Sequence, residues 1–271
     1  MFLKNIGELF PEVSHKLIEA PDKSVYYNHI HNHCELLLFI RGEADYNIDG
    51  QLFRPAPYDL LFIPAATYHY LIPSSSSTYE NYVIGIRRDM ISEKIYGKLF
   101  SAPLMISVKD DEELVGFFKR LDKYAETYSE GDFEKCATHL IEELIVYCSY
   151  RKNEQEQVNS GPLTHIEKII NYITDNIEKP LDAEMIAGHF MLSESYVQNM
   201  FSRDMHIGLK KYIMQKKIYS AHSDLEKGES ATSVCEKYSF GDYSVFYRLY
   251  KKHFGVSPVR KNSIPQNGGK K

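Results

Sequence analysis

The sequence predicts a two-domain α+β protein, with a small N-terminal β-barrel and two trailing helices ahead of an all-helical C-terminal domain. Short β-branched and aromatic runs, separated by turn residues, fill residues 16–88. Many such runs at even spacing are typical of a sandwich or small barrel. Apolar residues then recur at helical spacing in residues 110–151 and again in residues 166–254. A polar stretch without periodicity separates these two helical regions and is predicted to be a linker.

Five runs in the N-terminal region are predicted to be strands, because β-branched and aromatic residues are flanked by turn residues. Asp49-Gly50 joins two of them and is a strong hairpin signal, since both turn positions favour positive φ. The predicted strands are Glu35–Ile40, Tyr46–Ile48, Gln51–Phe53, Asp59–Ile63 and Tyr79–Ile86. A helix at Asp89–Phe100 and a further strand at Leu104–Val108 are predicted to follow.

A cluster of histidines marks the predicted barrel. His29 and His31 are two residues apart in a segment we expect to be a strand, so both side chains would point to one face with Glu35 in phase. Histidine and carboxylate together are ligands of first-row metals. His33 is also in phase, and we expect it to be structural or to lie at the rim.

The spacing H-x-H-x3-E-x6-G, followed by P-x-A-x2-H, resembles the two motifs of cupins, which are small jelly-roll β-barrels. The resemblance implies that His29, His31, Glu35 and His69 would be the ligands if this chain binds a divalent metal. Pro73 stands where the metal-binding pattern usually has Asn. Two other interpretations stay open: the histidines are hydrogen-bonded core residues, or they contact an organic effector in a pocket. No other cofactor is predicted.

Two helices, Asp110–Ser129 and Asp132–Arg151, are predicted to follow the barrel, with Gly131 breaking them into an antiparallel pair. Their apolar stripes would pack on the barrel and also pair two subunits as a homodimer. The stripes consist of Leu114, Phe117, Phe118, Leu121 and Tyr124, and of Leu140, Ile141, Leu144, Ile145 and Tyr147.

Charge and composition support a division into domains. Residues 1–162 carry 16 Lys and Arg against 25 Asp and Glu, whereas residues 163–271 carry 16 against 12. A basic C-terminal part suits a polyanionic partner. We expect an effector-binding and dimerisation domain at 1–152, a linker at 153–162, a helical domain at 163–262 and a disordered tail at 263–271. The four scattered cysteines, the lack of a signal peptide and the lack of a long apolar run predict a cytoplasmic protein without a membrane segment.

Six helices are predicted in the C-terminal part: Ile166–Asn176, Asp182–Phe190, Ser193–Arg203, Gly208–Lys227, Ser230–Tyr238 and Asp242–His253. Ser193, Ser230 and Asp242 are residue types that cap helix starts. The second and third helices, and the fifth and sixth, each form a helix-turn-helix pattern with a polar outer face. An ordinary helical hairpin with a solvated face would show the same periodicity.

The run FGDYSVFYRLYKKHFGVSP resembles the signature of AraC-type transcription regulators. Ser239 stands where Gly is usual, Tyr250 where Phe is usual, and Arg260 is the nearest residue to the closing Arg. Upstream, Leu192 to Phe201 resembles the family's first helix-turn-helix, with His206 where Gly is usual. The matching positions of the signature are Phe240, Asp242, Ser244, Phe246, Lys251, Lys252, Phe254, Gly255, Ser257 and Pro258.

The resemblance implies a sequence-specific DNA-binding transcription regulator, controlled by a small-molecule effector, for which a sugar is the default, and acting on promoter DNA together with RNA polymerase. The long helix between the two motifs would place both recognition helices in successive major grooves. Lys251 is expected to contact phosphate. The implied base-contacting residues are Ser195, Gln198, Asn199, Tyr243, Ser244, Tyr247 and Arg248.

Two other functions remain open at this point. A cupin metalloenzyme with an appended DNA-binding domain would use the histidine cluster for turnover, whereas we expect no enzymatic activity. A structural DNA-binding protein without an effector would need no pocket. The sequence does not indicate the effector, the operator, the dimer geometry, or whether transcription rises or falls.

Overall fold

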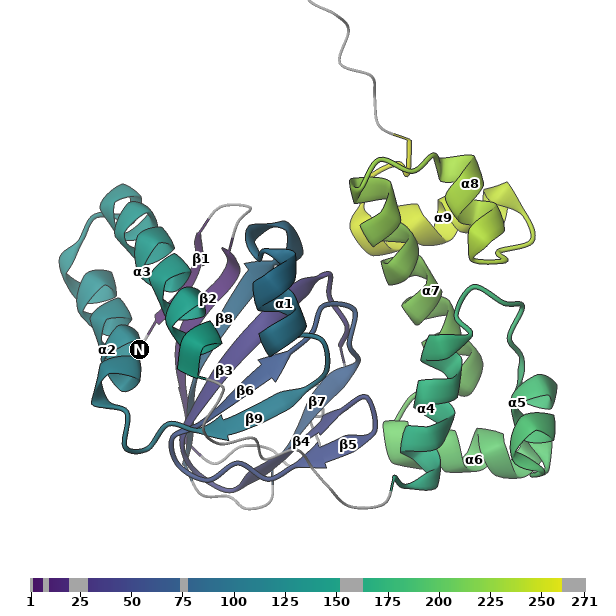
Figure 1. Ribbon diagram of the computed structural model, residues 1–271, viewed down its shortest axis with the longest axis horizontal. Coiled ribbons are helices and arrows are strands. Elements are labelled where there is room, and N and C mark those ends of the chain that lie inside the picture. Colours follow the sequence, from purple (N-terminus) through teal and green to yellow (C-terminus); the bar gives the residue numbers. More distant parts are fainter. Residues whose placement is uncertain (1, 7–9, 20–28, 74–77, 152–162, 260–271) are drawn as a thin grey trace, which may run out of the picture. The chain divides into compact units, whose positions relative to one another are not determined.

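The computed structural model describes residues 2–6, 10–19, 29–73, 78–151 and 163–259 (Figure 1). The chain groups into two compact units, Met1–Asn171 with Asn199–Ile207, and Tyr172–Gln198 with Gly208–Lys271. The predicted linker at 153–162 and the predicted tail at 263–271 lie outside the described residues. The predicted fold class, a β-rich N-terminal part followed by an all-helical C-terminal part, is confirmed.

Two antiparallel sheets make up the β-structure. The larger has the strand order β1-β2-β8-β3-β6-β9, and the smaller has the order β5-β4-β7. The strands are β1 Phe2–Ile6, β2 Phe10–Ile18, β3 His33–Arg41, β4 Ala44–Ile48, β5 Gln51–Phe53, β6 Asp59–Ile63, β7 His69–Pro73, β8 Tyr79–Arg87 and β9 Leu104–Ser107. The predicted strands are all present, while β1, β2 and β7 were not predicted.

The hairpin between β4 and β5 forms as predicted. Ile48 pairs with Gln51, and the two turn residues between them have φ values of +44° at Asp49 and +81° at Gly50. Both values lie in the left-handed region that this tight turn requires. The Asp49 carboxylate also accepts a hydrogen bond from the backbone N–H of Tyr68, at 3.1 Å, which ties the turn to the segment before β7.

The larger sheet is covered on both faces. Its inner face packs against the smaller sheet in a cluster that includes Leu37, Phe39, Tyr46 and Phe53. Its outer face packs against the helices that follow the barrel, through side chains such as Leu36. Consequently β3 has buried residues on both sides over most of its length.

The helices on the outer face are α1 Glu93–Leu99, α2 Glu112–Thr127 and α3 Glu130–Arg151, with a short 3₁₀ turn, η1 Arg88–Met90 (Figure 1). The single helix predicted at Asp89–Phe100 is therefore wrong, because Ser92 caps a new helix by accepting from the N–H of Ile95 at 3.3 Å. Gly131 does not separate α2 from α3 either, since it lies inside α3. Ser129 makes the break, because its hydroxyl accepts from the N–H of Asp132 at 3.3 Å.

His15 of β2 joins the sheet to α2. Its Nδ1 lies 2.8 Å from the Asp122 carboxylate of α2, and its Nε2 lies 2.9 Å from the Glu80 carboxylate of β8. The imidazole also stacks on the Tyr82 ring at a centroid distance of 3.9 Å. The apolar contact between helix and sheet thus has a polar anchor at its edge.

The C-terminal part contains α4 His165–Asp175, α5 Ala183–Phe190, α6 Glu194–Met205, α7 Leu209–Glu226, α8 Ala231–Lys237 and α9 Tyr243–Phe254. The three predicted caps are confirmed: the side chains of Ser193, Ser230 and Asp242 each accept a hydrogen bond from a backbone N–H in the first turn. Residues of α7, α8 and α9 share one core, in which Phe246 and Tyr250 of α9 are buried. The remaining face of α9 is left to solvent.

Two of the non-glycine residues with left-handed backbone lie in the helical part at positions of the AraC signature. Ser239, between α8 and α9, has φ +53°, and His206, after α6, has φ +52°. Both stand where the AraC signature usually has Gly, so left-handed backbone at these two positions does not require glycine. At Ser239 the hydroxyl donates to the carbonyl of Glu178 at 2.6 Å, which offsets part of the cost of left-handed backbone at a residue with a Cβ.

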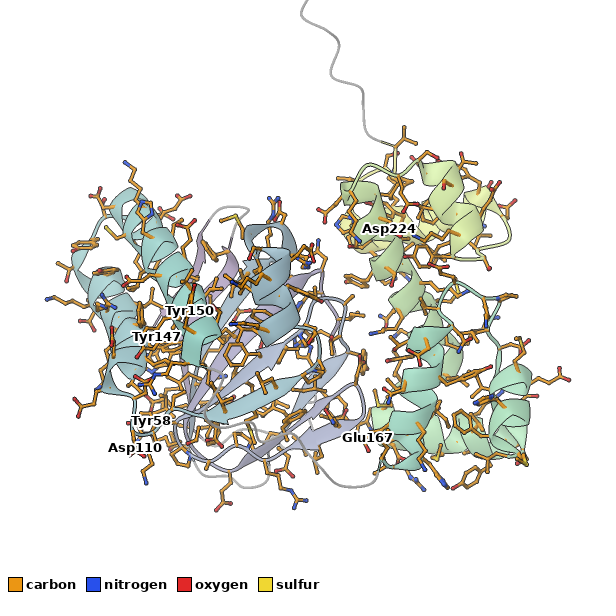
Figure 2. All side chains as sticks on the ribbon, viewed as in Figure 1. Tyr58, Asp110, Tyr147, Tyr150, Glu167 and Asp224 are labelled. Carbon is orange, nitrogen blue, oxygen red and sulfur yellow. The ribbon has the colours of Figure 1, made fainter. Side chains whose placement is uncertain are left out.

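Asp224 of α7 connects α7 to α8 (Figure 2). Its carboxylate, with 6% of the residue exposed, accepts from the Tyr238 hydroxyl at 2.7 Å, from Lys237 at 2.7 Å and from Lys227 at 3.2 Å. Burial by itself would raise the pKa of Asp224, but the hydrogen bonds from Lys237, Tyr238 and Lys227 outweigh it and lower that pKa.

We expect Asp224→Asn to lower the free energy of unfolding by about 2 kcal/mol at neutral pH, because the buried hydroxyl and ammonium lose their charged acceptor. Urea denaturation followed by circular dichroism measures this change in the free energy of unfolding. Glu229→Gln is the matched control: Glu229 is a more exposed partner of Lys237, at 3.1 Å, so its loss should cost less than about 0.5 kcal/mol. Equal effects of the two variants would contradict the stabilising role assigned to Asp224.

The difference in unfolding free energy between wild type and Asp224→Asn is predicted to depend on pH. A carboxyl whose pKa is lowered by folding stabilises the native state fully above its unfolded pKa, about 3.9 for aspartate, and loses that effect as pH falls through the folded pKa. The stability difference between wild type and Asp224→Asn should therefore be constant near neutral pH and narrow below about pH 4.

Candidate functional site

The register of β3 places Glu35 on the inner face of the larger sheet. Glu35 lies opposite Ile63 of β6 and Gly85 of β8. It is on the same side of β3 as Leu37 and Phe39, which face the smaller sheet. The carboxylate therefore points into the space between the sheets, with 7% of the residue exposed.

The histidines reach Glu35 from outside the strand. β3 begins at His33, so the expectation that His29 and His31 lie on a strand with Glu35 in phase is wrong. His29 instead forms an isolated antiparallel bridge with His69, the first residue of β7, through backbone hydrogen bonds of 3.2 and 3.1 Å. This bridge brings the rings of His29 and His69 to a centroid distance of 4.2 Å.

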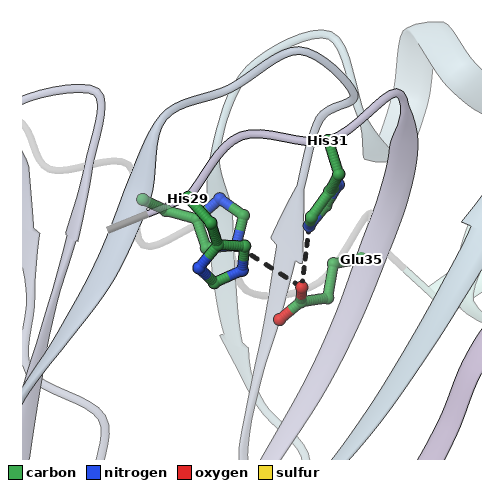
Figure 3. Close-up of side chains that lie close together, drawn as sticks. His29, His31 and Glu35 are labelled. Carbon is green, nitrogen blue, oxygen red and sulfur yellow. Dashed lines mark hydrogen bonds and ion pairs between the residues drawn. The ribbon is translucent and has the colours of Figure 1, made fainter. Parts of the chain in front are cut away.

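All four predicted side chains come together (Figure 3). One ligand atom from each of His29, His31, Glu35 and His69 can be chosen so that these atoms all lie within 4.8 Å of one another. Among the described residues, this is the one group of His, Cys, Asp and Glu side chains with such a geometry.

Backbone carbonyls set the orientation of two of the rings. The His31 Nδ1–H donates to the carbonyl of His33 at 2.8 Å, and the His69 Nδ1–H donates to the carbonyl of Thr67 at 2.9 Å. A carbonyl only accepts, so each Nδ1 carries a proton. Each Nε2 is then directed at the same Glu35 oxygen, at 3.1 Å from His31 and 3.4 Å from His69.

This arrangement requires positive charge. Two neutral imidazoles with protonated Nδ1 atoms would aim two Nε2 lone pairs at a carboxylate oxygen, and like partial charges repel. Burial would raise the pKa of Glu35, but the hydrogen bond with His31 and the close contact with the His69 ring hold it well below its usual range. Burial would lower the pKa of His69, but its contact with Glu35 raises it. Protons on the Nε2 atoms, or a metal cation between them, would supply the positive charge that the Glu35 carboxylate requires.

His33 supports the cluster without joining it. Its ring stacks on that of His31 at a centroid distance of 3.6 Å and an interplanar angle of 3°. Burial, together with the neighbouring His31, lowers the pKa of His33 to about 3, so it stays neutral. Gly85 makes room for it, since a Cβ at that position would lie 2.9 Å from the His33 ring. The expectation of a structural role for His33 agrees with this geometry.

Sequence reasoning missed a second polar group in the same interior. Tyr46 of β4 and Tyr79 of β8 are hydrogen-bonded through their hydroxyls and almost fully buried. Asn81 follows two residues later on the same face of β8, and its Oδ1 has no hydrogen-bond partner in the described chain. Burial raises the pKa of both tyrosines, and the Glu35 charge adds to the shift. The alternation of side chains along a strand could have revealed these residues, because it predicts which polar side chains of β4 and β8 point into the interior.

The predicted DNA-contacting side chains lie on the outer faces of α6 and α9. On α6, Ser195, Gln198 and Asn199 are exposed, while Val197 and Met200 are buried. On α9, the exposed or half-buried residues are Tyr243, Ser244, Tyr247, Arg248 and Lys251. Gln198 additionally donates from its amide to the Glu194 carboxylate at 2.7 Å, a contact that the sequence alone did not predict.

No helix of the described residues has the length and apolar character needed to cross a membrane. All four cysteines are free thiols.

Comparison with known protein families matches both parts of the chain. Residues 13–144 match the AraC-like ligand binding domain, and residues 186–261 match a helix-turn-helix domain. The first match spans the sheets with α1, α2 and most of α3, so it includes the Glu35 cluster. The second contains α6 to α9 with both sets of exposed polar side chains.

Individual proteins can also be aligned with this chain. An uncharacterised HTH-type transcriptional regulator of Bacillus subtilis, YfiF, is 23% identical over 86% of this chain and 78% of its own length. The multiple antibiotic resistance protein MarA of Escherichia coli is 30% identical over 41% of this chain and 87% of its own length. A crystal structure of ToxT from Vibrio cholerae with bound unsaturated fatty acid covers 93% of this chain and 94% of its own, at 13% identity and a TM-score of 0.39.

The match to MarA covers nearly all of that protein, and the helix-turn-helix match falls on the part of this chain with two such motifs. The ligand-binding match covers the β-rich part. The chain therefore belongs to the AraC family of DNA-binding transcription regulators and carries that family's ligand-binding domain.

Proposed function

We propose that this regulator responds to a small polar effector bound between its two sheets, with a sugar as the first candidate. The observation that carries the proposal is the convergence of His31, His69 and Glu35 in a buried interior. Tyr46, Tyr79 and Asn81 would add hydroxyl and amide groups to such a site. Interiors with a few placed polar groups among apolar side chains are typical of small-molecule sites.

The second part of the proposal is that His29, His31, Glu35 and His69 hold a divalent first-row metal, which would supply positive charge to the effector site. The residues fit such an ion. Two imidazoles donate their Nδ1–H to carbonyls, as metal-binding histidines commonly do, and thus present Nε2 as the ligand atom. The set of three histidines and one carboxylate suits metals from manganese to zinc.

Metal analysis tests this site. Purified full-length protein incubated with Mn²⁺, Ni²⁺ or Zn²⁺ and then dialysed should retain about one ion per chain with at least one of these metals. His31→Ala should weaken binding by at least about tenfold. His139→Ala is the control, because His139 is 83% exposed on α3 and distant from Glu35 along the chain. Protein that stays metal-free under all three conditions contradicts the metal site.

We propose a regulatory mechanism in which effector binding changes how two subunits are arranged and so shifts promoter occupancy. The layout would be an effector-binding and dimerisation domain at 1–152, a linker at 153–162, a DNA-binding domain at 163–262 and a tail at 263–271. RNA polymerase would be the partner on the promoter, in the cytoplasm. The relatives are transcription regulators, and we propose that this chain likewise acts without enzymatic turnover.

The proposed homodimer would use the outer face of α3. The apolar stripes that suggested dimerisation are buried within the chain itself, with Leu114, Phe118 and Leu144 at 0% exposure. On α3, Val146 and Tyr150 remain outside this core, 47% and 73% exposed. Tyr150 is labelled on α3 in Figure 2. Two apolar side chains one turn apart on an exposed helix suit a contact with the same helix of a second subunit.

Light scattering on the full chain tests the dimer. Wild type should have the mass of two chains at micromolar concentration, and Val146→Asp should have the mass of one, because it places a charge in the apolar contact. Leu52→Asp is the matched control, since Leu52 is exposed to a similar extent, 39%, on β5. A monomeric wild type, or a dimer that survives Val146→Asp together with Tyr150→Asp, contradicts this interface.

The DNA-reading part of the proposal assigns base contacts to the exposed residues of α6 and α9, with Arg248 foremost. Arginine donates two hydrogen bonds to guanine O6 and N7, whereas lysine contacts phosphate as a point charge. Arg248→Ala should weaken binding to a selected duplex by about 1–3 kcal/mol and relax the choice at one base pair.

Lys251→Ala serves as the comparison, because it should weaken all duplexes alike and lower the salt slope by about one. Both variants are titrated with a selected and a scrambled duplex at several salt concentrations. If Arg248→Ala weakens both duplexes equally, Arg248 is a phosphate contact and the assignment is wrong. If wild type shows no preference among duplexes, with or without candidate effectors, the regulator itself reads no sequence.

A further inference from the structure

The two recognition helices carry different charge. On α9, Arg248, Lys251 and Lys252 are exposed. On α6, the first helical residue is the exposed carboxylate Glu194, and Arg203, at the other end, is paired with Asp204 at 2.6 Å. The polar face of α6 thus has one cationic side chain, Arg203, which is paired with Asp204, whereas α9 has three exposed cationic side chains.

Glu194 and Gln198 form a defined pair. They are four residues apart, so they are neighbours on one helix face. The Gln198 Nε2 donates to Glu194 Oε1 at 2.7 Å, and both side chains are exposed. A carboxylate only accepts, so the contact decides which end of the Gln198 amide faces Glu194 and directs the Gln198 oxygen away from it.

We propose that Glu194 and Gln198 act as one base-reading unit, in which Glu194 both orients the Gln198 amide and selects bases that present an exocyclic amine in the major groove. The inference rests on the proposed sequence-specific DNA binding and adds a residue to its reading surface. Glu194 becomes a determinant of specificity, while α9 supplies most of the phosphate-dependent affinity.

The chemistry of the pair favours adenine and cytosine over guanine and thymine. Gln198 retains one amide N–H and its oxygen, which match adenine N7 and N6 in the major groove. Glu194 retains its second oxygen, which can accept from the N4 amine of cytosine. Guanine O6 and thymine O4 are hydrogen-bond acceptors and would face a carboxylate that has no proton to donate, so both acceptors would be left without a partner and their partial negative charges would repel the carboxylate.

The carboxylate also has a general effect on affinity. A negative side chain near the phosphates weakens binding to every duplex, so removing its charge should tighten binding to unrelated DNA. Base preference and overall affinity are thus expected to move in opposite directions when Glu194 is neutralised. A role limited to stabilising the helix N-terminus, where acidic residues are favourable, predicts no such change in preference.

The test is selection from a duplex pool randomised over the binding site, with full-length wild type, Glu194→Gln, Gln198→Ala and the double variant. Glu184→Gln is the matched control, because Glu184 lies in the first turn of α5 and has the same charge and a similar exposure. Thermal unfolding verifies that each variant is folded. The enriched sequences and the affinities for selected and unselected duplexes are compared.

We expect Glu194→Gln and Gln198→Ala to lose preference at the same one or two base pairs, by about five- to a hundredfold, and the double variant to lose little more. Glu194→Gln should also bind unselected duplex more tightly. Preference equal to wild type in Glu194→Gln overturns the inference, as does the same loss in Glu184→Gln. A wild type that enriches no sequence overturns the proposed function itself, which separates that failure from a failure of the pair.

Discussion

The structure depends on a sheet whose two faces are both apolar. In β3, Leu36 and Leu38 point to one side and Leu37 and Phe39 to the other, and all four are buried. One face is covered by the smaller sheet, so helices must cover the other. The apolar stripes of α2 and α3 meet that need, which makes these helices part of the barrel domain and leaves only their outer surfaces for contacts with a partner.

The same double burial explains the chemistry of the interior. A carboxylate between two apolar layers is costly unless it is matched by positive charge or hydrogen bonds. Glu35 is matched by His31 and His69, whose other ring nitrogens are held by backbone carbonyls. Because Glu35 contacts both His31 and His69, a change at any one of these side chains alters the electrostatic environment of the other two.

In the helical region, the burial of apolar helix faces determines which faces remain exposed. Phe246 and Tyr250 are buried in the core with α7 and α8, so the opposite face of α9, which includes Arg248, is exposed to solvent. Two buried polar contacts hold this core together: the Asp224 cluster and Lys217, whose ammonium donates to the carbonyls of Lys179 and Tyr238 at 2.6 and 2.8 Å. They join the turn before α5 and the turn before α9 to the connecting helix.

Local features were predictable from the sequence. The Asp49-Gly50 hairpin and the caps at Ser193, Ser230 and Asp242 depend on residues only a few positions apart, so spacing encodes them. The proximity of His29, His31, Glu35 and His69 was predicted as well, from their spacing and from the resemblance of that spacing to the cupin motifs.

The tertiary structure alone decided how distant segments meet. A backbone bridge to His69 holds His29 beside Glu35, and His31, which precedes β3, contacts Glu35 through its ring at 3.1 Å. Neither placement comes from strand alternation. Gly85 opens the space that His33 fills. Periodicity predicted that the apolar stripes of α2 and α3 pack on the barrel, but not that this packing buries most of their side chains within one chain. Such contacts depend on sheet register and on burial across many residues of separation, and neither is determined by the spacing of neighbours in the chain.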